Sequence, residues 1–111
     1  MELLKRFGRI TAGLTLGLGL MVGSNTAAAA DVVKLGFTGP LSGGAALYGK
    51  NTLTGIEMAV NEINKEGGLD IKGKKYKVEV VALDDKYSPS EAGTNARRLV
   101  QEHKTPVVFT P

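Results

Sequence analysis

Residues 34–51 read KLGFTGPLSGGAALYGKN, and this segment decides the fold class of the chain. It starts with a short apolar run that stops at Gly39 and Pro40, passes through a glycine-rich stretch, and leads into a helical pattern near Thr52. A strand, a glycine-rich loop and a helix in this order are the repeating unit of an open α/β sheet. Such sheets bind ligands where these loops leave the carboxyl ends of the strands. We therefore predict an α/β fold with a ligand site beside this loop.

The composition excludes several kinds of site. The chain has 111 residues, one His and no Cys, which excludes disulfides, thiolate nucleophiles and Cys-based or multi-histidine metal sites within it. The formal net charge of +3 falls to +1 when residues 1–30 are left out, because 11 Lys and Arg then stand against 10 Asp and Glu. A nearly neutral chain gives no support for nucleic-acid binding.

Residues 1–30 have the pattern of a cleavable secretory signal peptide. Three basic residues precede an uncharged, largely apolar run at 10–22, and the alanines at 27–30 provide the small residues of a cleavage site. The apolar run is shorter than the roughly 20 residues that span a membrane comfortably. We expect a mature N-terminus between Ala29 and Val32 and export to the periplasm. Because no Cys is present, we expect no lipoprotein anchor.

The rest of the chain alternates between strand and helix patterns. A short hairpin is expected around Gly73, where a polar, glycine-containing connection joins a helix to a strand. The order strand, helix, strand, helix, strand predicts a parallel sheet with helices on both faces. Because three strands and two helices are half or less of an ordinary doubly wound domain, we expect this fold to be incomplete. The expected strands are 32–38, 76–83 and 107–110, and the expected helices are 52–66 and a second one from Ser88 to before Pro106.

The start of the second helix carries the sharpest local signal. Ser88 is a good N-cap, Pro89 suits the first helical position, and Glu91 would complete a capping box. Gly93 lowers the helix propensity and suggests close packing at that point. The residues expected on the buried face are Ala92, Ala96, Leu99, Val100 and His103.

The first loop has features of two nucleotide-binding motifs. Gly44, Gly49 and Lys50 have the spacing of a P-loop, but Asn51 stands where the motif requires the hydroxyl that holds Mg²⁺. The loop also starts well past its strand. A dinucleotide site requires G-x-G-x-x-G, which residues 31–111 lack. Both kinds of nucleotide site are therefore disfavoured.

Asp84 and Asp85 end the second predicted parallel strand and could form a catalytic pair. Adjacent strand residues point to opposite faces, so two such carboxylates seldom share a site. We expect them instead to cap the next loop or to bond to backbone amides of a neighbouring turn. No pairing of a nucleophile with a base is visible in the sequence.

The first loop suits recognition of a carboxylate. Ser42 offers a hydroxyl, its neighbouring glycines expose backbone amides, and the helix near Thr52 directs further amides and a partial positive charge at the loop. Tyr48 is the only large aromatic residue here. It is either a surface for an apolar ligand group or a core or interdomain aromatic.

Several motifs occur in a fixed order along the chain: 34–43 (KLGFTGPLSG), 47–50 (LYGK), 55–64 (GIEMAVNEIN), 67–68 (GG), 83–89 (LDDKYSP) and 96–100 (ARRLV). With this order and spacing, the chain resembles the leucine-binding protein family over essentially all of residues 32–111. The members of this family are the extracytoplasmic receptors of branched-chain amino-acid ABC importers.

The resemblance implies a type I periplasmic-binding-protein fold, in which two α/β domains close on an amino acid or related small carboxylate. Residues 31–111 would be the first βαβαβ portion of domain 1. The groups that hold the ligand's α-amino and α-carboxylate groups would lie beyond Pro111. Tyr48 would pack on the ligand side chain, with Ser42 and Leu41 near the cleft. The receptor would be a monomer without cofactor or catalysis that delivers its solute to a membrane permease.

Two other functions stay open on the residues alone. One is an exported α/β enzyme such as a hydrolase, and the other is the ligand-sensing domain of a receptor. The family's frequent disulfide after the second parallel strand has no counterpart here, because the chain contains no Cys.

Overall fold

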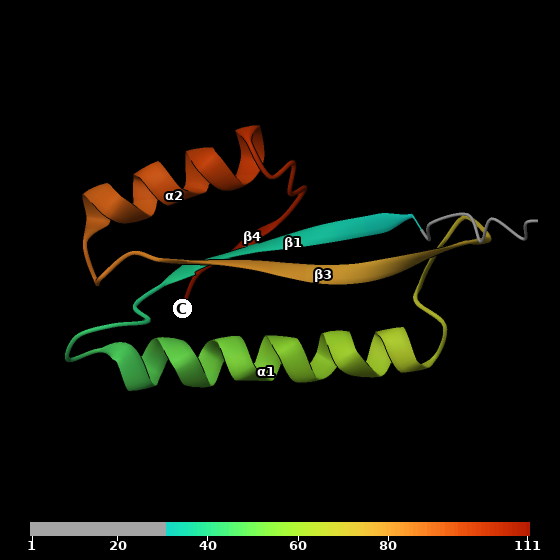
Figure 1. The fold of residues 1–111 in the computed structure, drawn as a ribbon, viewed down its shortest axis with the longest axis horizontal. Helices are drawn as coiled ribbons and strands as arrows, with labels where there is room; N and C mark the ends of the chain where they lie inside the picture. The colour runs from blue at the N-terminus through green and yellow to red at the C-terminus, as the bar shows by residue number, and fades with distance from the viewer. Residues whose placement is uncertain (1–30) are drawn as a thin grey trace, which may run out of the picture.

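The computed structural model describes residues 31–111, and the signal peptide predicted for residues 1–30 lies outside them. One sheet of four strands carries a helix on each face (Figure 1). The sheet order is β2-β3-β1-β4. The elements are β1 (Val32–Gly39), α1 (Ala46–Lys65), β2 (Leu69–Ile71), β3 (Lys74–Asp84), α2 (Pro89–Gln101) and β4 (Val108–Phe109).

The strand β1 is central and runs parallel to both of its neighbours. It pairs with β3 along its whole length, from Val32 opposite Lys77 to Gly39 opposite Asp84, and with β4 at Gly36 and Phe37. The short β2 pairs antiparallel with the start of β3. This is the hairpin predicted around Gly73, a residue with a φ of 82°. The predicted βαβαβ order with helices on both faces is confirmed.

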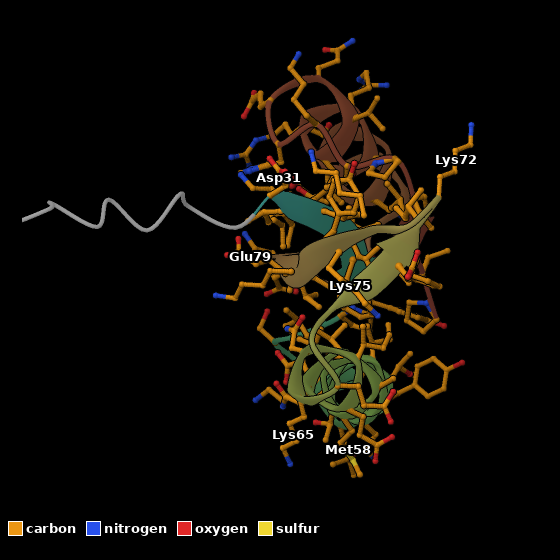
Figure 2. The ribbon with its side chains drawn as sticks, turned by 90° about the vertical axis from the view of Figure 1, so that its right-hand side faces the viewer. Asp31, Met58, Lys65, Lys72, Lys75 and Glu79 are labelled. Carbon is orange, nitrogen blue, oxygen red and sulfur yellow. The ribbon has the colours of Figure 1, made fainter. Side chains whose placement is uncertain are left out.

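The two faces of β1 explain how the helices reach the sheet. A Cβ on Gly36 would lie 3.2 Å from Leu99 Cδ1, so the side chain of Leu99 packs closely over β1 from α2. Phe37, the next residue, therefore points to the opposite face, toward α1. Phe37 and Leu99 are both fully buried. Figure 2 shows the resulting layers, with α2 above the sheet and α1 below it, and with Met58 and Lys65 pointing away from the sheet.

The first helix begins six residues earlier than predicted, at Ala46 instead of Thr52. The sequence pattern places Gly49 in the glycine-rich loop, but Gly49 is a buried residue of α1. A Cβ at this position would collide with the carbonyl group of Pro40. The glycine is thus needed because the first turn of α1 packs directly on the chain that leaves β1. No side chain caps this helix, so its start had no local signal in the sequence.

The start of α2 is as predicted, with Ser88 as N-cap and Pro89 at the first helical position. The Ser88 hydroxyl accepts a bond from the Glu91 N–H, at 3.5 Å. The predicted reciprocal half of the capping box is wrong. The N–H of Ser88 donates instead to the carbonyl of Asp85, at 2.9 Å, because the loop before the helix turns back on itself.

The buried face of α2 is centred differently from the prediction. Leu99 is buried as expected, but Val100 is 53% exposed and the buried polar residue is Asn95. Asn95 and Leu99 lie one turn apart and both face the sheet, which turns Val100 toward solvent. Gly93 has open space where a Cβ would be, so the close packing suggested there is also wrong. Within residues 31–111, neither helix combines the length and apolar character needed to cross a bilayer.

Candidate functional site

The loops that follow β1 and β3 meet the end of the chain at one edge of the sheet, because all three parallel strands point that way (Figure 1). A pocket of about 330 Å³ lies there. Its volume is at the lower end of the range for small-molecule sites. The lining residues are Pro40, Tyr48, Asp85, Tyr87, Ser88, Pro89, Ala92, Thr110 and Pro111.

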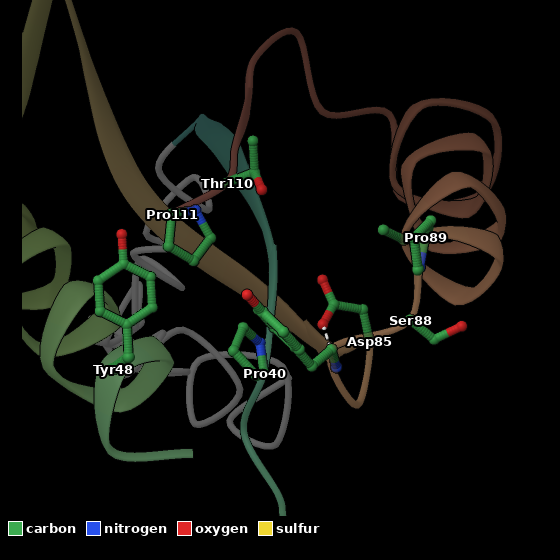
Figure 3. Close-up of a pocket in the computed structure, with 9 residues that line it drawn as sticks. Pro40, Tyr48, Asp85, Ser88, Pro89, Thr110 and Pro111 are labelled. Carbon is green, nitrogen blue, oxygen red and sulfur yellow. Dashed lines mark hydrogen bonds between the residues drawn. The ribbon is translucent and has the colours of Figure 1, made fainter. Parts of the chain in front are cut away.

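Figure 3 shows how the elements share this pocket. Tyr48, from the first turn of α1, stands on one side, and Ser88 and Pro89, at the start of α2, stand on the other. Tyr48 is 60% exposed. Tyr48 therefore does not lie in the core of residues 31–111, and its roles as a ligand surface or an interdomain contact both stay predictions.

The other two candidate residues lie beside the pocket and do not line it. Both are tied to Asp84 at the end of β3. The backbone N–H of Leu41 donates to Asp84 Oδ1, at 2.8 Å, and the hydroxyl of Ser42 donates to Asp84 Oδ2. Whether Leu41 and Ser42 touch a ligand stays a prediction.

The carboxylate of Asp84 also binds its own loop, since Oδ1 accepts a bond from the N–H of Lys86, at 2.9 Å. These donors stabilise the charged form. The Ser42 hydroxyl, followed by the N–H groups of Leu41 and Lys86, lowers the pKa of Asp84 to about 2. The prediction that the strand-end aspartates bond to backbone amides is confirmed for Asp84.

Asp85 points to the other face, as the alternation along a strand requires. It is buried, and it accepts bonds from the Thr38 hydroxyl, at 3.3 Å, and from the N–H of Tyr87, at 2.9 Å. The side-chain amide of Asn95 completes this cluster by donating to Thr38 Oγ1 and to the carbonyl of Asp84. The cluster joins β1, β3 and α2 beneath the pocket.

Thr38 and Asn95 were not among the residues predicted from the sequence. A signal for Asn95 existed, because position 95 lies one turn before Leu99, on the face that packs against the sheet. For Thr38 we find no comparable signal in the sequence.

The loop after β3 holds two residues in an unusual conformation. Lys86 and Tyr87 have φ values of 53° and 61°, which cost residues other than glycine about 1–3 kcal/mol each. Asp84 accepts the N–H of Lys86, and Asp85 accepts the N–H of Tyr87. Each aspartate thus supports one residue of the turn between β3 and α2, and Tyr87 of this turn lines the pocket.

The chemistry available at the pocket is that of binding. Prolines and aromatic rings offer apolar surface, and the hydroxyl groups of Ser88 and Thr110 offer hydrogen bonds. The amino end of α2 adds a partial positive charge. Within residues 31–111, no group of three or more His, Cys, Asp or Glu side chains is arranged to hold a metal ion.

Residues 32–111 match the sequence model of the family described as periplasmic binding protein. The chain belongs to this family. It is similar to the Leu/Ile/Val-binding protein homolog 8 of Brucella suis biovar 1 (strain 1330), with 41% identity over 95 residues that are 86% of this chain and 22% of the relative. The predicted resemblance to the leucine-binding proteins is confirmed.

Solved structures of this family share the fold. The branched-chain amino acid transporter substrate binding protein LivJ of Streptococcus pneumoniae, in complex with isoleucine, matches with a TM-score of 0.64 and 38% identity, over 73% of this chain and 22% of LivJ. A solute binding protein of an ABC transporter from Rhodopseudomonas palustris BisB5, in complex with 3,4-dihydroxybenzoic acid, matches with a TM-score of 0.52 and 32% identity, over 70% of this chain and 20% of that protein.

The chain spans about a fifth of the length of the curated relatives it matches. The structure accordingly corresponds to one part of the type I periplasmic-binding-protein fold that these relatives share. Members of the family bind solutes and are not enzymes, in agreement with the expected absence of catalysis.

Proposed function

We propose that this protein is the extracytoplasmic solute-binding component of an ABC importer, and that its solute is a branched-chain amino acid or a related small carboxylate. The observation that carries the proposal is the position of Tyr48, which lines a pocket at the carboxyl end of the sheet in a chain 41% identical to a Leu/Ile/Val-binding protein homologue. Ligands of open α/β sheets bind at this edge.

In this proposal the pocket receives the apolar part of the solute. Tyr48 and Pro40 would contact the side chain, and the amino end of α2 would favour a nearby negative charge. The groups that hold the α-amino and α-carboxylate groups belong, by family resemblance, to the chain after Pro111. Closure of a second domain over the solute would shift an open–closed equilibrium toward the form that a membrane permease recognises.

The names and ligands of the relatives favour a branched-chain amino acid over an aromatic acid as the solute. The Brucella relative is called a Leu/Ile/Val-binding homologue, and LivJ was solved with isoleucine. The Rhodopseudomonas protein, which holds 3,4-dihydroxybenzoic acid, is the less similar of the two structures. An aromatic acid is thus a second outcome to be tested.

The test is calorimetry together with thermal denaturation of the full-length mature protein. The solutes are leucine, isoleucine, valine and 3,4-dihydroxybenzoate, with glucose as a solute without a carboxylate. We expect one of the carboxylates to bind saturably, and a hundredfold excess over its Kd to stabilise the protein by about 2.7 kcal/mol. If none of the four carboxylates stabilises the protein, or if the protein chemically converts one of them, the proposal is contradicted.

We also propose that residues 1–30 are a signal peptide and that the mature protein is a periplasmic monomer. The basic start, the apolar run at 10–22 and the alanines before Asp31 support this. Sequencing the N-terminus of the exported protein should find a start between Ala29 and Val32, and sedimentation should find one copy. A mature chain that still begins at Met1 would rule out the signal peptide.

A further inference from the structure

One carboxylate joins the two loops that border the pocket. Asp84 Oδ1 accepts the N–H of Leu41 at 2.8 Å and the N–H of Lys86 at 2.9 Å, and Asp84 Oδ2 accepts the hydroxyl of Ser42. Leu41 and Ser42 belong to the loop between β1 and α1, whereas Lys86 belongs to the loop between β3 and α2. The carboxylate therefore links the loop that follows Pro40 to the loop that contains Tyr87, and both of these residues line the pocket.

The first of these loops packs against the helical turn that carries Tyr48. Leu41 follows Pro40, and the carbonyl of Pro40 packs so closely on Gly49 that a Cβ on Gly49 has no room. Gly49 follows Tyr48 in the first turn of α1, and its N–H donates to the carbonyl of Ala45. A shift of Pro40 toward α1 would therefore push on the helical turn that carries the Tyr48 ring.

The second loop depends on the same carboxylate. Lys86 has a φ of 53°, an energetically unfavourable conformation for a lysine, and its N–H is held by Asp84. Tyr87, the next residue, also lines the pocket and directly precedes Ser88. Loss of the Asp84 carboxylate would remove hydrogen bonds from both loops at once.

We propose that Asp84 is a positioning residue for solute recognition, which bridges the two loops and thereby sets the place of the Tyr48 ring at the pocket. The inference rests on the proposed solute-binding function and adds a residue that does not line the pocket. It also gives Ser42 a supporting role. The hydroxyl proton of Ser42 is already donated to Asp84, so it is not available to a solute in this arrangement.

A double-mutant cycle tests this, because residues that act through one another are not additive. Isoleucine affinity would be measured by calorimetry for the full-length wild type, Asp84→Ala, Tyr48→Ala and the double variant. Each single change should weaken binding about three- to thirtyfold. The double variant should bind no more than about twofold more weakly than Tyr48→Ala. If isoleucine does not bind to the wild type, the cycle uses whichever of leucine, valine or 3,4-dihydroxybenzoate does.

Two further variants separate positioning from a general loss of stability. Asp84→Asn keeps an oxygen for the N–H groups of Leu41 and Lys86, and its amide can donate to Ser42, so it should restore affinity to within about threefold of the wild type. Asp70→Ala is the matched control. Asp70 accepts the N–H of Gly73 at 2.8 Å in the hairpin at the opposite end of the sheet, so this change should lower the melting temperature without changing affinity.

If Asp84→Ala does not fold, Ser42→Ala takes its place in the cycle. The effect of Ser42→Ala should be non-additive with that of Tyr48→Ala if the hydroxyl acts by supporting Asp84. The two effects should be additive if the hydroxyl contacts the solute directly. Additive effects, or an unchanged affinity in Asp84→Ala while the wild type binds, would overturn the positioning role and leave the proposed function intact. A wild type that binds none of the four solutes would overturn the proposed function, and this inference with it.

Discussion

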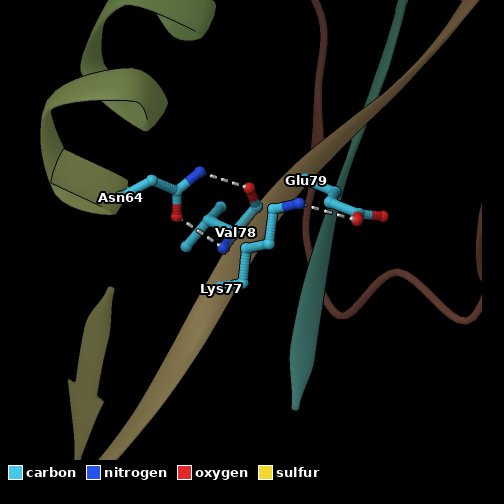
Figure 4. A network of polar contacts seen from close by, with 4 residues as sticks. All are labelled: Asn64, Lys77, Val78 and Glu79. Atoms are coloured by element: carbon cyan, nitrogen blue, oxygen red, sulfur yellow. Dashed lines mark hydrogen bonds and ion pairs between the residues drawn. The ribbon is translucent and has the colours of Figure 1, made fainter. Parts of the chain in front are cut away.

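The side-chain amide of Asn64 bonds to both main-chain polar groups of Val78 (Figure 4). Asn64 Nδ2 donates to the carbonyl of Val78 at 2.8 Å, and Asn64 Oδ1 accepts its N–H at 2.9 Å. The strand β2 pairs with β3 only as far as Tyr76. Asn64 thus takes the place of a strand partner for Val78, which lies beyond the last residue of β3 that pairs with β2. It holds the end of α1 against the edge of the sheet.

We expect Asn64→Ala to destabilise the full-length protein by about 1–3 kcal/mol, because it leaves the main-chain groups of a buried residue without their partner. Urea denaturation measures the loss. Asn61→Ala is the control, since Asn61 is an exposed residue of the same helix and undergoes the same change in helix propensity. Equal effects of the two substitutions would mean that the Asn64 bonds contribute nothing measurable.

Gly49→Ala should be destabilising and Gly55→Ala should not, although both glycines lie in α1. A Cβ at position 49 would meet the Pro40 carbonyl, whereas a Cβ at position 55 has nothing within 4 Å. We expect a loss of about 1–3 kcal/mol at position 49 and a gain of up to about 1 kcal/mol at position 55. Thermal denaturation of both variants checks this, and a stable Gly49→Ala protein would disprove the close approach to Pro40.

Tyr48→Ala should weaken solute binding by about 1–2 kcal/mol, because the ring supplies apolar surface to the pocket. Tyr48→Phe keeps the ring and removes only the hydroxyl, so its affinity should stay near that of the wild type. Calorimetry with the solute that binds best measures both. An unchanged affinity in Tyr48→Ala would assign Tyr48 a structural role only.

The stability of the protein should fall in acid partly through Asp84. Its folded pKa of about 2 lies below the ordinary value of 3.8. The stability that the charged carboxylate contributes is therefore fully present above the ordinary pKa and is lost as the pH falls through the folded pKa. Urea denaturation of the wild type and of Asp84→Asn should give a difference that shrinks from about pH 5 to about pH 2.

Ser42→Ala provides the control for this titration. The Ser42 hydroxyl is the largest cause of the lowered pKa of Asp84. Without this hydroxyl the folded pKa of Asp84 should lie closer to its ordinary value. The stability difference between Ser42→Ala and Ser42→Ala with Asp84→Asn should therefore change over a narrower pH interval than the difference between the wild type and Asp84→Asn. A difference between wild type and Asp84→Asn that does not vary with pH would refute the lowered pKa.

Local signals in the sequence were sufficient for the order of elements. Alternating apolar residues predicted the parallel strands, Gly73 predicted the hairpin, and Ser88 with Pro89 predicted the start of α2. These patterns succeed because they depend on backbone geometry within a few residues of one another. The family followed from the same local segments, since they occur in order and at a constant spacing.

The sequence by itself thus determined the α/β class, the family and the edge of the sheet where a ligand site would lie. Only the tertiary structure decided that Gly49 belongs to α1, that Asn95 and not Val100 faces the sheet, and that Ser42 donates to Asp84. The place of Gly49 depends on the approach of Pro40 to α1. The other two depend on contacts between separate elements, such as that of Ser42 with Asp84, which are 42 residues apart. Such contacts form when elements pack together, and no local pattern of residue types encodes them.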